Sequence, residues 1–380
     1  MPTRTFPNAS ARGYTSPVPP TREPLDFHRR LPGYEQTRLV EAPRLAELLG
    51  VGEVWVKDES GRLGLPSFKI LGASWATFRA VLQRLGKDPG EWATISELAD
   101  RLDELRPMTL SAATDGNHGR AVARMARLLG LGARIFVPQG TARARIEGIE
   151  SEGAPVTVVV GTYEDAVEAA AGLAGEGCLL IQDTAVDDED QTSRWVIEGY
   201  STIFWEIEDR LAELGREPPD LLAVQIGVGA LAASVVRHFR RPEPAPRPRI
   251  VGVEPDRAAC ALASMEAGHI VTIPGPHDSA MAGLNCGEPS SVAWPEVSGG
   301  VDLFVAVEDQ RAFDAVRRMA EAGLVSGETG AAGLAGLLEL LAGDGLPARE
   351  MLAVGHDDRV LLISTEGATD PEAYRRIVGR

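Results

Sequence analysis

From Val54 onward, short runs of β-branched and apolar residues alternate with segments of helical periodicity, and Gly, Pro and Asp residues separate them. The pattern predicts strands at Val54–Val56, Thr109–Ala113, Arg134–Val137, Val156–Val160, Leu179–Gln182, Leu221–Ile226, Arg249–Val253, Leu303–Val307 and Arg359–Ser364. It predicts helices at Phe68–Arg84, His118–Leu129, Tyr163–Ala174, Trp195–Leu214, Leu231–Phe239 and Gln310–Ala322. Such alternation is typical of an α/β fold with twisted parallel sheets flanked by helices. Because these sheets bind ligands beyond the carboxyl ends of their strands, we expect functional residues in the loops that follow strands.

The length of 380 residues allows two or three domains, or two lobes around a shared site, at roughly 150 residues per domain. We expect a smaller domain over residues 71–182 and a larger one formed by residues 31–70 and 183–380. Residues 1–30 are rich in proline and arginine and lack the apolar run of a secretory signal. We therefore expect them to form an N-terminal arm.

The charge balance argues against nucleic-acid and membrane roles. The chain has 38 Lys and Arg against 55 Asp and Glu, a formal net charge of −17 at pH 7. Such a chain repels phosphate backbones and anionic lipid surfaces, and the sequence contains no basic patch that would override this. The three cysteines are too few and too scattered for a metal site or a disulfide framework, so we expect a cytoplasmic protein without a bound metal.

A lysine with apolar neighbours stands at the start of the predicted helix Phe68–Arg84. Lys69 directly precedes Ile70 and Leu71. Desolvation disfavours the ammonium form, so an amine held among these side chains would be neutral enough to form a Schiff base with a carbonyl cofactor. Taken alone, the segment also fits an ordinary surface lysine whose stem covers apolar neighbours.

The loop after the predicted strand Thr109–Ala113 concentrates polar side chains. It consists of Thr114, Asp115, Gly116, Asn117, His118 and Gly119, and it opens the next predicted helix. The glycines let the backbone approach a planar ligand, while a carboxylate, an amide and an imidazole offer polar contacts. An Asn or Asp at such a position is also a common helix N-cap, and the segment alone does not exclude that simpler role.

Three further segments follow predicted strands. One of them is a glycine-rich loop formed by Gly227, Val228, Gly229, Ala230 and Leu231. Its backbone N–H groups, at the start of a helix, form a natural phosphate cradle, although Ala232 leaves the dinucleotide pattern G-x-G-x-x-G incomplete and packing alone often demands glycine there. Two other strands end at Asp183 and at Ser364 and Thr365. Together with the lysine, these segments favour a ligand site.

Taken jointly, the segments resemble the tryptophan-synthase-like, fold type II pyridoxal-phosphate enzymes. That resemblance rests on Ser67-Phe68-Lys69, Thr114–Gly119, Gly227–Leu231 and Ser364–Gly367, in this order. Further segments resemble the diaminopropionate ammonia-lyases, namely Leu31–Tyr34, Val56–Ser60, Gln182–Ala185, Met281–Pro289 and Ser326–Ala331. Serine and threonine dehydratases usually carry Ser-Ser or Ser-Ala where this chain has Thr114-Asp115, so the acid distinguishes the two groups.

The resemblance implies that pyridoxal 5'-phosphate binds between two lobes. The implied cofactor-binding residues are Lys69, Phe68, Asn117, Gly227, Val228, Gly229, Ala230, Leu231, Ser364 and Thr365. Lys69 would hold the cofactor covalently, and Asn117 would hydrogen-bond its 3-oxygen. The glycine-rich loop would bind the phosphate through backbone N–H groups. A hydroxyl of Ser364 or Thr365 would meet the pyridine nitrogen, which suits β-elimination.

The resemblance also implies the reaction, an α,β-elimination of ammonia from 2,3-diaminopropionate by a homodimer. The implied catalytic residues are Lys69, Asp115 and Asp183, and the implied substrate-binding residues are Thr114, Asp115, Gly116, His118 and Asp183. Lys69 would take the Cα proton. The two carboxylates would bind the cationic β-amino group, and Asp115 would also act as a base on the opposite face for the D-enantiomer.

One segment departs from the family pattern. After Ala185 the family usually continues Trp-Glu-Gly-Tyr, whereas this chain has Val186-Asp187-Asp188-Glu189. Elimination or β-replacement on serine, threonine or another β-substituted amino acid is therefore the alternative reaction. An inactive homologue that binds an amino acid or a partner protein is the alternative outside enzymes. The resemblance also leaves open whether Cys260 and Cys286 form a bridge or stay free thiols.

Overall fold

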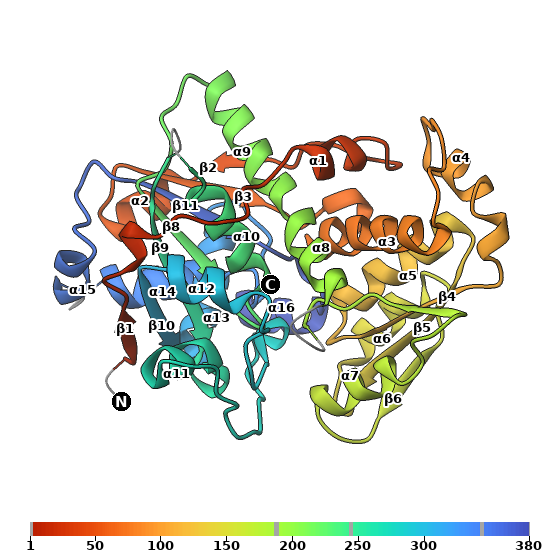
Figure 1. Cartoon of the computed structure of the whole chain (residues 1–380). Coiled ribbons are helices and arrows are strands. Elements are labelled where there is room, and N and C mark those ends of the chain that lie inside the picture. Colours follow the sequence, from red (N-terminus) through yellow and green to blue (C-terminus); the bar gives the residue numbers. More distant parts are fainter. Residues whose placement is uncertain (1–2, 186–189, 243–245, 343–345, 380) are drawn as a thin grey trace. The chain divides into compact units, whose positions relative to one another are not determined.

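The computed structural model describes residues 3–185, 190–242, 246–342 and 346–379. It divides the chain into two compact units, unit 1 with residues 1–20, 36–61 and 203–380 and unit 2 with residues 21–35 and 62–202. Both units are α/β, as the alternating pattern predicts (Figure 1). Within the described ranges, no helix combines the length and the apolar character needed to cross a membrane.

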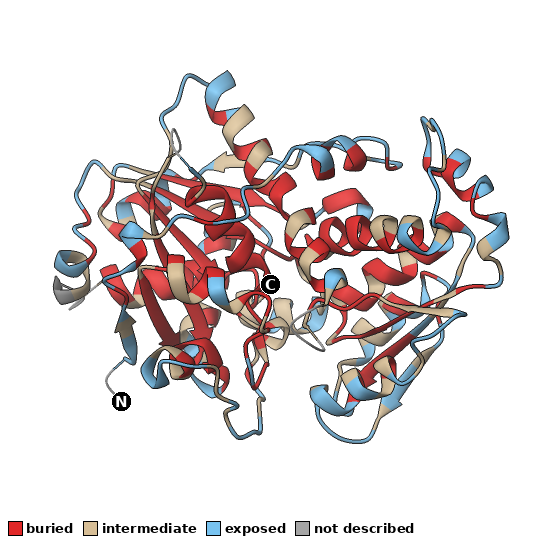
Figure 2. Ribbon diagram, viewed as in Figure 1, coloured by how far each residue is buried: buried red, intermediate tan, exposed pale blue. Residues whose placement is uncertain are grey.

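Unit 1 is built on a seven-stranded sheet in the order β1-β10-β9-β8-β11-β3-β2. Its strands are β1 Thr5–Pro7, β2 Leu39–Glu41, β3 Glu53–Asp58, β8 Leu221–Gln225, β9 Arg249–Pro255, β10 Leu303–Val307 and β11 Arg359–Ser364. The five central strands are parallel, and β1 and β2 pair antiparallel at the two edges. The central strands are buried along almost their whole length, which explains their continuous apolar runs (Figure 2).

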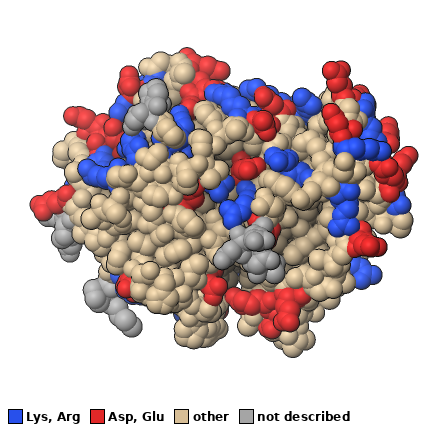
Figure 3. Space-filling view, in the orientation of Figure 1, with Lys and Arg blue, Asp and Glu red and all other residues tan. Residues whose placement is uncertain are grey.

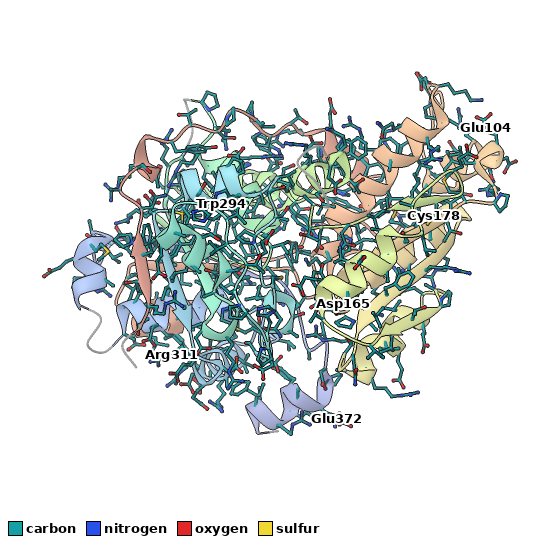
Figure 4. The ribbon with its side chains drawn as sticks, turned by 60° about the horizontal axis from the view of Figure 1, so that its bottom comes forward. Glu104, Asp165, Cys178, Trp294, Arg311 and Glu372 are labelled. Atoms are coloured by element: carbon teal, nitrogen blue, oxygen red, sulfur yellow. The ribbon has the colours of Figure 1, made fainter. Side chains whose placement is uncertain are left out.

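The helices of unit 1 follow its strands in the chain. They are α2 Pro43–Leu49, α9 Ser201–Glu213, α10 Ala230–Phe239, α11 Cys260–Ala267, α12 Trp294–Gly300, α13 Asp309–Glu321, α14 Ala332–Leu341, α15 Leu346–Met351 and α16 Pro371–Val378. The short helix α16 begins with an Asp370 cap and an acidic first turn that includes Glu372, which suits the positive end of a helix dipole (Figure 4).

Unit 2 contains a four-stranded sheet in the order β6-β5-β4-β7, with every pair parallel. Its strands are β4 Thr109–Ala113, β5 Gly132–Pro138, β6 Val156–Val159 and β7 Cys178–Leu180. Its helices are α1 Glu23–His28, α3 Lys69–Leu85, α4 Ile95–Asp100, α5 Asn117–Leu129, α6 Arg143–Glu150, α7 Tyr163–Ala171 and α8 Gln191–Gly199. Thr162 and Asp165 form a capping box that starts α7 (Figure 4).

The predicted strands are all present, and β4, β10 and β11 have the predicted bounds. The predicted helix Trp195–Leu214 is instead two helices, α8 and α9, which join at Tyr200. The break lies where the chain packs closely on α3. A Cβ on Gly72 of α3 would lie only 2.6 Å from the Tyr200 ring. This packing of α8 against α3 also explains why residues 183–202 belong to unit 2, in contrast to the predicted domain boundary at 182.

Residues 3–30, the described part of the predicted arm, are folded into the units, which differs from the prediction. The strand β1 pairs with β10, with Phe6 opposite Phe304. In unit 2, the ring of Phe27 on α1 stacks on that of Phe78 on α3, with centroids 4.6 Å apart. The apolar residues of this N-terminal segment are too few, and too often separated by prolines, to give a periodic signal. Only these long-range contacts therefore show that the segment is folded.

On the face shown in Figure 3, Lys and Arg side chains lie interspersed with Asp and Glu. One charged pair lies inside unit 1 instead of on its surface. Lys57 Nζ donates to Glu206 Oε2 at 2.6 Å, and the two side chains are 0% and 2% exposed. Lys57 Nζ also donates to the main-chain oxygen of Thr37 at 2.9 Å. This pair ties β3 to α9.

We expect Glu206→Gln to lower the free energy of unfolding by about 3–5 kcal/mol, because it removes the carboxylate that Lys57 Nζ contacts at 2.6 Å inside unit 1. Glu213→Gln is the matched control on the same helix. Glu213 pairs with Arg210, and these side chains are 59% and 45% exposed, so its loss should cost only about 0–1 kcal/mol. Denaturant unfolding of both variants measures the difference. Equal costs would show that the buried pair contributes no more than the surface pair.

Candidate active site

Lys69 is the first residue of α3, and it is paired with a carboxylate. Its Nζ lies 2.6 Å from Asp183 Oδ2, and the two side chains are 17% and 7% exposed. The Phe68 ring lies 5.5 Å from the same nitrogen and also packs against Tyr200, with ring centroids 4.6 Å apart. The predicted apolar surroundings are therefore present, together with a partner that the local sequence does not contain.

The pair changes the expected protonation state of Lys69. Burial lowers the pKa of Lys69, but the charges around it, that of Asp183 above all, and its hydrogen bond with Asp183 together outweigh burial, so the pKa lies above the ordinary lysine value. Burial raises the pKa of Asp183, but Lys69 and His118 act in the opposite direction, and the resulting pKa is about 2. The expectation of a neutral amine is thus wrong, because Lys69 and Asp183 form an ion pair in the structure. The lysine must lose a proton before it can react with a carbonyl group.

The loop from Thr114 to Gly119 joins β4 to α5 and is held from within. Thr114 Oγ1 accepts the N–H of Gly116 at 2.9 Å and that of Gly119 at 3.1 Å, and the Thr114 side chain is buried. A Cβ on Gly119 would lie 2.4 Å from Thr114 Cγ2, so this position needs glycine. Asn117 begins α5. The Thr114 hydroxyl therefore organises the loop.

His118 points from α5 towards Asp183. Its Nε2 donates to the main-chain oxygen of Ile181 at 2.8 Å, since a carbonyl oxygen can only accept. Its Nδ1 lies 3.9 Å from Asp183 Oδ2 and, among the described residues, has no hydrogen-bond partner. The side chain is 1% exposed. His118 is thus a buried side chain next to Asp183.

Sequence reasoning missed two residues next to these groups. Tyr200 is fully buried beside Lys69, and its hydroxyl has no hydrogen-bond partner in the described parts of the chain. Burial raises the pKa of Tyr200, which keeps the hydroxyl neutral. Arg145, on α6, pairs with Asp115 at 3.1 Å. No local sequence pattern predicts that Tyr200 or Arg145 belongs to the site, because packing between segments far apart in the sequence brings each of them there.

In unit 1, the glycine-rich loop follows β8 and opens α10. Gly229 is the N-cap of α10 and has φ +99°, a conformation that favours glycine. A Cβ on Gly227 would lie 3.0 Å from the main-chain oxygen of Gly283. The first N–H groups of a helix have no intrahelical acceptor, so those of Ala230 and Leu231 are free to meet an anion. The loop fits a phosphate group.

The two hydroxyls at the end of β11 lie next to β8 in the same sheet. Ser364 Oγ donates to Ser326 Oγ at 2.8 Å. Thr365 Oγ1 accepts from Gln225 Nε2, also at 2.8 Å, so the Thr365 proton stays available for a further acceptor. Both side chains are 1% exposed. This arrangement is compatible with a pyridine nitrogen as that acceptor.

The cysteines of the chain are free thiols in the structure. Cys260 and Cys286 both lie at Gly227. Cys260 Sγ is 3.9 Å from the main-chain oxygen of Gly227, and Cys286 Sγ is 3.4 Å from the position that a Cβ on Gly227 would occupy. Burial raises the pKa of the Cys260 thiol. The segment Val186–Glu189, which departs from the family pattern, lies outside the described residues.

Two α/β units built mainly on parallel strands, one with a lysine at a helix start and the other with a glycine-rich loop at a helix start, are typical of the fold type II class of cofactor-dependent enzymes. A family model described as pyridoxal-phosphate dependent enzyme matches residues 30–365. The chain belongs to this family of pyridoxal-phosphate-dependent enzymes.

Within the family, the chain is similar to diaminopropionate ammonia-lyases. It is 36% identical to the enzyme of Salmonella typhimurium over 369 residues, which cover 94% of this chain and 91% of that protein. It is 35% identical to the enzyme of Escherichia coli, with 93% and 89% covered. The crystal structure of the Escherichia coli enzyme in complex with D-serine matches with a TM-score of 0.90 and 32% identity, and covers 99% of this chain and 96% of that one.

Proposed function

We propose that this chain is a pyridoxal-phosphate-dependent lyase that converts 2,3-diaminopropionate and water into pyruvate and two molecules of ammonia. The observation that carries the proposal is the pair of acids near one lysine in unit 2. Asp183 contacts Lys69 directly, and Asp115 is close enough to raise the lysine pKa. A substrate with a second, positively charged amino group explains why two carboxylates lie near this one lysine.

The relatives support the same substrate. Diaminopropionate ammonia-lyases share more than a third of their residues with this chain over nearly its whole length. The L-threonine dehydratase of Corynebacterium glutamicum is 27% identical over 85% of the chain. The acid at position 115, which the dehydratase pattern lacks, supports the first group over the second.

The chain's own residues divide the work of the reaction. Bound pyridoxal phosphate would supply an electron sink for the bond that breaks at Cα. Lys69 Nζ would take the Cα proton, with Asp183 at 2.6 Å ready to stabilise the ammonium that results. Asp115 would bind the β-ammonium group of the substrate. The hydrogen bond from His118 Nε2 to the main-chain oxygen of Ile181 would hold the segment that carries Asp183 in place.

Release of a 2-oxo acid, which is 2-oxobutyrate from L-threonine and pyruvate from the other members, from a panel of β-substituted amino acids tests the proposal. The panel contains D- and L-diaminopropionate, L-serine, L-threonine and β-chloro-L-alanine, each assayed with the holoenzyme. We expect kcat/KM to be highest for diaminopropionate. A preference for a hydroxy amino acid would show that the enzyme is a dehydratase and not an ammonia-lyase. The absence of turnover for every member would favour an inactive homologue.

We also propose that the enzyme works as a cytoplasmic homodimer. The family resemblance supports the dimer, and the free thiols of Cys178, Cys260 and Cys286 suit a reducing compartment. Light scattering of the holoenzyme in solution measures the oligomeric state directly. A mass near that of one 40.5 kDa chain would contradict the dimer.

A further inference from the structure

A single arginine holds the side chain and the backbone of Asp115. Arg145 Nη1 donates to Asp115 Oδ2 at 3.1 Å and to the Asp115 main-chain oxygen at 3.3 Å. The Arg145 side chain is 8% exposed, whereas that of Asp115 is 25% exposed. The cation is thus largely buried behind a carboxylate that remains accessible. Because both contacts use one nitrogen, the orientation of the carboxylate relative to its own backbone is constrained.

The neighbouring glycine is what lets Arg145 come so close. Gly116 has φ +145°, and a Cβ added there would lie 3.1–3.2 Å from Cβ, Cγ and Cδ of Arg145. The stem of the arginine therefore lies over the bare backbone of the loop. Thr114 holds the same loop from the inside through the N–H groups of Gly116 and Gly119. Because the loop is held from both sides, the Asp115 side chain can take few orientations.

We propose that Arg145 is a positioning residue that determines substrate specificity by aiming Asp115 at the β-ammonium group. Arg145 occupies Oδ2, and none of the described residues donates a hydrogen bond to Oδ1, which leaves that oxygen for the substrate. The guanidinium keeps its charge at every working pH, so the arrangement does not depend on titration of the arginine. This inference rests on the proposed function, because only a substrate with a charged β-group needs a correctly aimed Asp115.

The test compares Arg145→Gln with Arg143→Gln in the holoenzyme. Arg143 lies in the same first turn of α6 but is 86% exposed and pairs with Glu147, so it is a matched control. We expect Arg145→Gln to lower kcat for D-diaminopropionate about ten- to a hundredfold, because Asp115 is also the proposed base for this enantiomer and a misaimed base costs mainly rate. The L-enantiomer should lose less. Turnover of β-chloro-L-alanine, whose β-substituent is uncharged, and the visible absorbance of the bound cofactor should change less than about twofold.

Two further variants separate positioning from a structural role. Arg145→Lys keeps a cation and should recover most of the lost kcat. In an Asp115→Asn background, Arg145→Gln should cost less than about twofold, because there is no longer a carboxylate to aim. An undiminished cost in that background, equal losses for diaminopropionate and β-chloro-L-alanine, or behaviour like Arg143→Gln would overturn the inference. If the wild type itself releases no pyruvate from diaminopropionate, the proposed function fails instead.

Discussion

Lys69→Ala should abolish turnover of every substrate in the panel while the chain still folds. The variant lacks the amine that would hold the cofactor covalently and take the Cα proton, and proton transfer alone contributes roughly 10²–10⁴-fold to a rate. The visible absorbance of a lysine-bound cofactor, and its loss on treatment with borohydride, should disappear together with activity. Lys69 is only 17% exposed and stands at a helix start, so the substitution removes few packing contacts.

Two variants control this experiment. Lys87→Ala removes a lysine of the same unit that is 61% exposed and pairs with Glu104, and it should leave absorbance and turnover unchanged (Figure 4). Lys69→Arg keeps the countercharge of Asp183 but cannot act as a base or form a Schiff base, so it should be as inactive as the alanine variant. Turnover of Lys69→Ala at the wild-type rate would refute the assignment of the lysine.

Asp115→Asn should separate substrates by the charge of their β-group. The amide keeps the size of the side chain but loses the charge partner of a β-ammonium, and a charge-assisted hydrogen bond is worth roughly 1.5–3 kcal/mol, or about ten- to a hundredfold in kcat/KM. L-Serine has no such group and should be little affected. If Asp115 is also the base on the opposite face, D-diaminopropionate should lose a further factor of roughly 10²–10⁴.

The three substrates measured side by side provide the control for this variant. A uniform fall in kcat/KM for L-serine and both diaminopropionate enantiomers would mean that Asp115 only organises its loop. Comparable falls for the two enantiomers alone would retain the binding role and remove the role as a base.

Much of the architecture could be predicted because its signals are local. Five consecutive apolar residues predict the strand Leu303–Val307, and a helical period that begins after a polar loop predicts α5. The short edge strand Thr5–Pro7 gave no such signal, because three residues between prolines and polar groups do not establish a period. Its structure depends on the edge of β10, about 300 residues away in the chain, whose pairing only the folded sheet provides.

The site divides in the same way. The residue types of the proposed site could be predicted from the sequence alone, because the chemistry and the loop geometry belong to those residues themselves: Lys69 at a helix start, and Asp115, Asp183 and the glycine-rich loop after strands. Tertiary structure decided their state and their partners. Asp183, 114 residues from Lys69, turns an amine expected to be neutral into one half of an ion pair. Arg145, 30 residues from Asp115, determines where that carboxylate points. Electrostatic energy depends on distance in space, and distance in space between segments far apart in the sequence is established only when the chain folds.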